Sequence, residues 1–240
     1  MRVAILGLGF SLSDFAEQTK RAGGRSKLFD QVWSINALGD VFASDLVFHM
    51  DDVRVQEIRA KAKPESNIAA MLEWIKTSKV PVMTSRLHPD YPALVEFPLE
   101  DVLNNLGHDY FNNTGAYAVA YAIHIGATQI SCFGMDYTYP NRHDAEKGRA
   151  CVEFWLGEAH ARNIDIKLPK ATTLMDSNCE SRLYGYDTLH VALDVNDEGM
   201  VKVGFTEVET LPTAEQIEAN YDHKAPIEKQ HQSLKHQSDR

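Results

Sequence analysis

Two short segments carry the residue types that could bind a phosphorylated ligand. Gly7-Leu8-Gly9-Phe10-Ser11 follows an apolar run, and Asn112-Asn113-Thr114-Gly115 precedes an alanine-rich run. Glycines let a phosphate approach the backbone, and the first turn of a helix offers free N–H groups and the positive end of its dipole. A plain tight turn and an ordinary helix cap are the alternatives. The candidate phosphate-binding residues are Gly7, Gly9, Ser11, Asn113, Thr114 and Gly115.

Carboxylates end two other apolar runs. Asp51 and Asp52 close the segment "LVFHMDD", and Asp136 closes "TQISCFGMD". Carboxylate oxygens can bind Mg²⁺, accept hydrogen bonds from a ribose, or cap the helix that follows. We therefore take Asp51 and Asp52 as candidate metal ligands, with helix capping as the alternative. Asp136 is a candidate catalytic residue, because an acid directly after a buried strand lies where ligands bind.

The residues that follow Asp136 could recognise phosphate and move a proton. Tyr137, Tyr139, Arg142 and His143 lie within a few positions of one another. A guanidinium binds phosphate through several N–H groups, and an imidazole exchanges a proton near neutral pH. We therefore expect phosphate contacts from the two tyrosines and Arg142, and proton transfer by His143. A polar surface loop without these functions is the alternative.

The order of elements explains how these segments could meet. Short apolar runs alternate with helical patterns, which is typical of an α/β protein with a Rossmann-like, mostly parallel sheet and helices on both faces. In such a sheet, ligands bind beyond the carboxyl ends of the strands. Asn36 ends the second predicted strand and joins the candidate nucleotide-binding residues. Strands are predicted at 2–9, 31–36, 44–52, 80–85, 128–137 and 164–169, and helices at 11–23, 116–126 and 145–163, with 86–110 largely irregular. Residues 54–77 are predicted to form one or two helices, broken near Lys63-Pro64.

The pattern also predicts how the chain divides. Residues 1–170 are expected to form the Rossmann-like nucleotide-binding and catalytic domain. Residues 171–211 are expected to form a C-terminal extension that packs on it, with a β-hairpin that turns near 196–199. Residues 212–240 are polar and are expected to form a flexible tail.

Composition excludes several classes of function. The 240 residues carry a net charge of −10 and are 44% apolar, so general nucleic-acid binding, which needs a basic face, is not expected. No apolar run approaches the ~20 residues of a membrane helix, and no signal peptide is expected. Three cysteines without a CxxC pair indicate a reduced protein, so the predicted location is the cytoplasm.

Four segments, in order, resemble a known superfamily: "GLGFSL", "WSIN", "LVFHMDD" and "TGAYAVAYAIHIGATQISCFGMDY". The chain resembles, over roughly residues 1–168, the superfamily that joins MptE-like 6-hydroxymethylpterin diphosphokinases with bacterial lipooligosaccharide sialyltransferases. Its strongest part lies at 113–137. There, members typically have a small residue, Ser or Thr, Gly, an alanine-rich helix, and a strand that ends in Gly-x-Asp.

The resemblance implies roles for residues already singled out. Gly7, Gly9 and Ser11 would make the first phosphate or nucleoside contact, Asn36 would contact the nucleotide, and Asn113, Thr114 and Gly115 would hold the nucleotide end of the donor. Tyr137 and Tyr139 would bind donor phosphate, and His143 would be the general base. Phe10 stands where the family commonly has proline, and Leu8 and either Met50 or Asp51 stand where the sialyltransferases have asparagines. The Asp51-Asp52 pair is more typical of the metal-using branch.

The sequence leaves three functions open. The leading hypothesis is a transferase with a nucleotide-activated donor, a glycosyltransferase that moves a sugar from a nucleotide sugar to an acceptor hydroxyl. No other cofactor is indicated, apart from an optional Mg²⁺, and the acceptor could be a glycan, a small metabolite or a modified nucleobase. The alternatives are a Mg²⁺-dependent diphosphokinase that uses ATP on a small alcohol, and a nucleotide-binding protein without catalysis.

Overall fold

The computed structural model describes residues 1–138, 140–179, 189–195, 201–207 and 213–220. The chain forms two compact units, Met1–Glu180 and Ser181–Arg240. Three sequence-based predictions fall outside the described residues: the role of Tyr139, the hairpin turn near 196–199, and the tail beyond residue 220. Residues 171–179 are described together with the first unit, which also contains every other predicted site residue.

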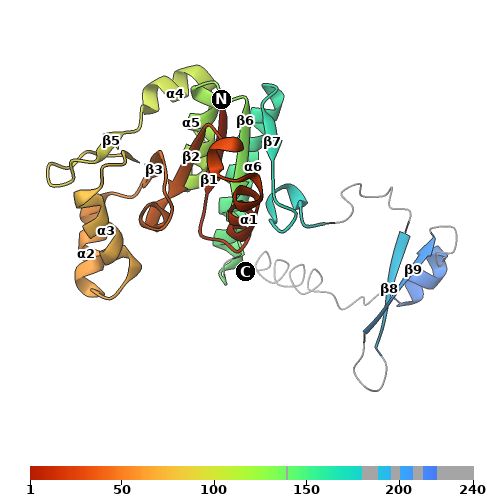
Figure 1. The fold of residues 1–240 in the computed structure, drawn as a ribbon. Helices are drawn as coiled ribbons and strands as arrows, with labels where there is room; N and C mark the ends of the chain where they lie inside the picture. Colours follow the sequence, from red (N-terminus) through yellow and green to blue (C-terminus); the bar gives the residue numbers. More distant parts are fainter. Residues whose placement is uncertain (139, 180–188, 196–200, 208–212, 221–240) are drawn as a thin grey trace, which may run out of the picture. The chain divides into compact units, whose positions relative to one another are not determined.

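The first unit is built around one parallel sheet (Figure 1). Seven strands pair in the order β5-β4-β3-β2-β1-β6-β7, and every pairing is parallel. The chain adds strands outward from β1 to β5, then returns to place β6 and β7 on the other side of β1. The strand order therefore reverses between β1 and β6, which is the position where open α/β sheets bind ligands. The strands are β1 (Arg2–Leu6), β2 (Gln31–Ile35), β3 (Leu46–Phe48), β4 (Val82–Thr84), β5 (Leu94–Glu96), β6 (Gln129–Phe133) and β7 (Asp165–Lys167).

Helices cover both faces of this sheet, as the sequence predicts. Successive residues of a strand point to opposite faces. In β1, Val3 and Ile5 pack in a core with α5 and α6, whereas Ala4 and Leu6 pack with Phe15 of α1. The core that contains α5 and α6 also includes buried residues of α4. A separate core packs α2 and α3 against the same face of the sheet as α1. The helices are α1 (Leu12–Ala22), α2 (Val53–Ala62), α3 (Asn67–Thr77), α4 (Leu99–Leu106), α5 (Thr114–His124) and α6 (Arg142–Ala161), with short 3-10 turns η1 (Arg25–Lys27), η2 (Asn36–Asp40) and η3 (Leu174–Asp176).

The alanine-rich segment forms α5, which lies directly on the sheet. Its buried side chains are mostly alanine, so the helix contacts β1, β2 and β3 closely. Asn113 caps the helix, since its side-chain oxygen accepts a hydrogen bond from the backbone N–H of Ala116 at 3.1 Å. The "NNTG" turn therefore fixes where α5 begins, and this start lies at the carboxyl edge of the sheet.

Two helices differ from the prediction. The segment 86–110, predicted as irregular, contains α4, whose buried Val102 and Leu106 follow helical spacing and which ends at Gly107 with φ +76°. α6 begins at Arg142, earlier than the predicted 145. Arg142 and His143 therefore lie in the first turn of a helix and not in a loop.

The second unit contains the predicted hairpin. β8 (Leu189–Val195) and β9 (Val201–Glu207) pair antiparallel, with Val195 opposite Val201. A helix, α7 (Ala214–Asn220), lies inside the segment that the sequence assigns to the tail. None of the described helices is long and apolar enough to cross a membrane.

Candidate functional site

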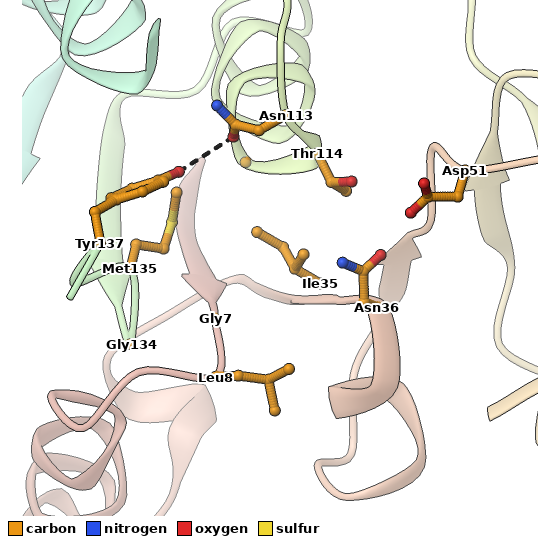
Figure 2. A pocket seen from close by; sticks show the side chains of 11 residues that line it. Gly7, Leu8, Ile35, Asn36, Asp51, Asn113, Thr114, Gly134, Met135 and Tyr137 are labelled. Carbon is orange, nitrogen blue, oxygen red and sulfur yellow. Dashed lines mark hydrogen bonds between the residues drawn. The ribbon is translucent and has the colours of Figure 1, made fainter. Parts of the chain in front are cut away.

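A cavity of about 360 Å³ lies at the carboxyl edge of the sheet, beyond the ends of β1 and β6 (Figure 2). We call it the switch-point cavity. Figure 2 shows Tyr137 and Met135 on its β6 side and Asn36 and Asp51 across from them, with Asn113 and Thr114 between. Segments from β1, β2, β3, α5 and β6 therefore meet here, as the sequence predicts for a parallel sheet. The lining residues are Gly7, Leu8, Ile35, Asn36, Asp51, Asn113, Thr114, Gly115, Gly134, Met135 and Tyr137.

The glycines after β1 are required by close backbone contact with β6. The N–H of Gly7 donates to the Phe133 carbonyl oxygen at 2.7 Å, and the N–H of Gly9 donates to that of Gly134 at 2.7 Å. A Cβ on Gly7 would overlap the Gly134 carbonyl oxygen, and a Cβ on Gly9 would overlap the Asp136 carboxylate. Gly7 thus lines the cavity floor, whereas Gly9 lies behind it.

Ser11 and Asp136 bind each other behind that floor. Each is 1% exposed, and neither lines the cavity. The Asp136 carboxylate accepts hydrogen bonds from the backbone N–H of Ser11 at 2.8 Å and from its hydroxyl at 2.5 Å. The Ser11 hydroxyl in turn accepts from the N–H of Gly134 at 2.8 Å. This placement gives no support to phosphate binding by Ser11 or catalysis by Asp136, and it indicates that the pair holds the two loops together.

The N-terminus of α5 points into the cavity. Asn113, Thr114 and Gly115 all line it, and the first N–H groups of a helix have no partner within the helix. The Asn113 oxygen also accepts a hydrogen bond from the Tyr137 hydroxyl at 3.1 Å, which links the cap to the segment after β6. Free N–H groups and the helix dipole make this turn a suitable anion site.

Two residues of the cavity hold a backbone conformation that is unusual for residues other than glycine. Asn36 has φ +55° and Tyr137 has φ +49°, in the left-handed region. For an aromatic residue this is a genuine outlier, and such strain gathers at functional sites. The Tyr137 ring packs on Gly148 of α6, where an added Cβ would lie 2.6 Å from the ring. The strained backbone and this contact together fix the ring at the cavity wall.

The two candidate metal ligands are placed differently. Asp52 does not line the cavity; its carboxylate caps α2 by accepting from the Arg54 N–H at 2.9 Å and pairs with Arg86 at 3.3 Å. Asp51 does line the cavity. Among the described residues, no three His, Cys, Asp or Glu side chains form a metal-binding group. Of the two candidates, Asp51 could bind a Mg²⁺ that takes its other ligands from water and substrate phosphates.

A second cavity, of about 330 Å³, lies along the start of α6, and we call it the α6 cavity. Tyr137 borders both cavities, so the two adjoin. Arg142 lines the α6 cavity, as does Arg149, which pairs with Asp176 at 3.3 Å. His143 is exposed in the first turn of α6 and lines neither cavity. Of the residues predicted after Asp136, Tyr137 therefore lines the switch-point cavity, whereas Arg142 and His143 lie outside it.

His49, at the end of β3, is a site residue that the sequence reasoning missed. It is 1% exposed, and its Nδ1–H donates to the side-chain oxygen of Asn36 at 3.0 Å. Burial lowers the pKa of His49, and the nearby Asp51 carboxylate acts in the opposite direction. The available signal was its position, since a histidine that directly follows a buried strand lies at the ligand-binding edge of the sheet.

Stability is expected to fall as the pH drops below about 6.5, the usual histidine pKa, in part because of His49. The pKa of His49 is lower in the folded protein than in the unfolded chain, so as the pH falls the unfolded chain is protonated first. This protonation favours the unfolded state. The contribution of neutral His49 to folding stability is therefore fully present above the unfolded pKa. It is lost as the pH falls from the unfolded pKa through the folded pKa. Urea unfolding at pH 7.5 and 5.5 should show a smaller loss in His49→Gln than in the natural protein. The exposed His160→Gln is the control, and equal losses in all three proteins would contradict the assignment.

Comparison with known proteins gives a remote similarity only. The sequence matches no protein-family model and no curated protein. Among solved structures, the chain is similar to the sialyltransferase CST-II in complex with a trisaccharide acceptor and CMP. Identity is 13%, coverage is 91% of this chain and 98% of that chain, and the TM-score is 0.45. The chain is also similar to the sialyltransferase CstII from Campylobacter jejuni in complex with the substrate analogue CMP-3FNeuAc. Here the identity is 15%, the coverage is 91% of this chain and 97% of that chain, and the TM-score is 0.45. A similarity at this level does not identify a function for this chain.

Proposed function

We propose that the first unit binds the phosphate of a nucleotide-activated donor in the switch-point cavity. It then transfers the activated group, a sugar in the leading form of the proposal, to an acceptor hydroxyl. One observation carries this proposal: the α5 N-terminus and the glycine turn after β1 meet in one cavity at the point where the strand order reverses. That combination of backbone N–H groups, helix dipole and close backbone approach favours an anionic ligand.

The remaining lining suits the rest of a nucleotide. Leu8, Ile35 and Met135 offer apolar surface for a ring, and the Asn36 amide group offers hydrogen bonds. Figure 2 shows the Asn36 amide nitrogen directed toward the cavity. Tyr137, packed on Gly148, lies at the cavity wall, and its hydroxyl would exchange its hydrogen bond to Asn113 for one to a departing phosphate. Groups fixed in advance of the reaction stabilise developing negative charge efficiently.

The binding part of the proposal is tested by a variant that fills the cavity. A Cβ on Gly115 would lie 2.7 Å from Met135 Cε and 3.1 Å from the Tyr137 hydroxyl, so Gly115→Val should block the anion site. A nucleotide at 100 times its dissociation constant raises stability by about 2.7 kcal/mol, and the variant should lose most of that gain. The measurement is the thermal shift across nucleotides and nucleotide sugars, compared with the same protein without ligand. Gly157→Val, on an open face of α6, is the matched control. An undiminished shift in Gly115→Val would contradict the proposal.

We assign the proton transfer to His143, an exposed residue that follows Arg142 in the first turn of α6. In this arrangement the acceptor hydroxyl would enter from the α6 cavity, which adjoins the donor site at Tyr137. General-base catalysis contributes about 10²–10⁴-fold, so His143→Ala should lower turnover by that factor and leave donor affinity unchanged. His160→Ala, at the far end of the same helix, is the control. Turnover of His143→Ala within about threefold of the natural protein would show that another group takes the proton.

Asp51 favours a second candidate, a Mg²⁺-dependent diphosphate transfer from ATP to a small alcohol. Its carboxylate lines the cavity where phosphates would lie, and Mg²⁺ binds through one or two carboxylates together with substrate phosphates. An ATP-induced thermal shift that requires Mg²⁺ would favour this candidate over the glycosyltransferase. Nucleotide binding with no turnover of any donor would instead favour a binding protein without catalysis.

A further inference from the structure

A third cavity, of about 250 Å³, extends from the switch-point cavity toward α2 and α3, and we call it the side cavity. Leu8, Asn36 and Asp51 line both cavities, so the two share a wall. The other residues of the side cavity come from η2, the end of β3 and the starts of α2 and α3: Ala37, His49, Gln56, Asn67, Ile68 and Met71.

Two buried polar atoms of this lining have no hydrogen-bond partner. They are Nε2 of His49 and the side-chain oxygen of Gln56, in residues that are 1% and 4% exposed. Buried polar atoms are nearly always paired, because an unpaired one loses its hydrogen bonds to water without replacement. The two residues that carry these atoms come from different elements and line one cavity, which indicates a place for a ligand.

The chemistry of these atoms defines the ligand. His49 donates from Nδ1 to Asn36, so a neutral His49 can only accept at Nε2. The Gln56 oxygen also accepts, and the shared wall adds the Asp51 carboxylate, a third acceptor with a negative charge. Leu8, Ile68 and Met71 supply apolar surface. The cavity thus presents acceptors and a negative charge, and it disfavours an anion.

We propose that the side cavity is a subsite for an uncharged group that carries hydrogen-bond donors. The group is either the hydroxyls of a neutral sugar or the exocyclic amine of a nucleobase. An acidic sugar does not fit, because its carboxylate would face Asp51 and two acceptors. This inference rests on the proposed function, since the switch-point cavity must hold the adjoining phosphate.

The test is isothermal titration calorimetry with matched ligand pairs. CMP with UMP and AMP with IMP differ by an exocyclic amine, and UDP-glucose with UDP-glucuronate differ by a carboxylate. The variants are Gln56→Met and His49→Leu, each of which removes one acceptor. The control is His88→Leu, because His88 also has an unpartnered Nε2 but lines none of the three cavities described above. Each lost hydrogen bond should weaken binding by roughly 3- to 10-fold.

A preference for the amine-bearing nucleotides that falls in both side-cavity variants supports the inference and identifies the base as the occupant. A preference for UDP-glucose over UDP and UDP-glucuronate that falls in the same variants identifies a neutral sugar. A preference for UDP-glucuronate, or affinities that do not change in either variant, overturns the inference but leaves the proposed function in place. If no nucleotide binds the natural protein, the proposed function fails and this inference fails with it.

Discussion

Asp136→Ala is expected to lower the free energy of unfolding by about 3–5 kcal/mol, since a hydrogen bond to a charged group contributes about 1.5–3 kcal/mol. The substitution removes the acceptor for both the backbone N–H and the hydroxyl of Ser11. It leaves these donors in a region where Asp136 itself is 1% exposed. The measurement is urea unfolding of the two proteins at pH 7.5.

Asp40→Ala is the control, because Asp40 is an exposed acid at the end of η2 and its loss should change stability by less than about 0.5 kcal/mol. If Asp136→Ala were as stable as the control, Asp136 would not hold the loops. A catalytic role would then regain its place as the explanation of this residue.

Gly134→Ala should be equally damaging, by about 3–5 kcal/mol, for two reasons that can be separated. Gly134 has φ +65°, a conformation that costs a residue with a side chain about 1–2 kcal/mol. A Cβ there would also overlap the Gly7 carbonyl oxygen, which belongs to rigid backbone. The new methyl group would therefore force β1 and β6 apart at the floor of the cavity.

Two other glycines separate these causes, because Gly126 has the positive φ without the overlap and Gly157 has neither. Gly126 has φ +75° with nothing within 4 Å of an added Cβ, so Gly126→Ala reports the backbone cost alone. Gly157 lies on the open face of α6, so Gly157→Ala should stabilise by about 0.5–1 kcal/mol. The account requires Gly134→Ala to be clearly worse than Gly126→Ala in chemical unfolding. Equal losses would mean that the β1–β6 contact is looser than described.

Much of the cavity could be predicted because a parallel sheet brings all its strand ends to one edge. Residues that follow β1, β2 and β3, such as Gly7, Asn36 and Asp51, meet there whatever the loops between them do. The capping sequence at Asn113 fixed the start of α5 in the same way. These predictions needed only the order of the elements and the position of each strand's end.

The sequence could not show which polar residues bind each other. Ser11 and Asp136 lie far apart in the chain, and both had the residue type and position of a ligand-binding group. Only the folded structure reveals that they pair and are buried. His49 and Gln56 were missed for the opposite reason. The only signal for His49 was its position after β3, and Gln56 gives no signal until its neighbours show that its side-chain oxygen has no partner.

The sequence predicted which segments form helices better than it predicted where each helix begins and ends. The pattern of α6 is clear from Val152 to Leu156, where buried residues repeat, but its first turn is polar and exposed. Hydrophobic spacing therefore could not locate the start at Arg142. This difference matters for function, because it moves Arg142 and His143 from a loop to a helix.

The most direct test of the central proposal is a crystal structure of this protein with the nucleotide that binds most tightly. We expect a phosphate oxygen within hydrogen-bond distance of a backbone N–H of Thr114 or Gly115, with the rest of the ligand in the switch-point cavity. A phosphate held instead by Arg142 and Arg149 in the α6 cavity, with the α5 N-terminus unoccupied, would contradict the account.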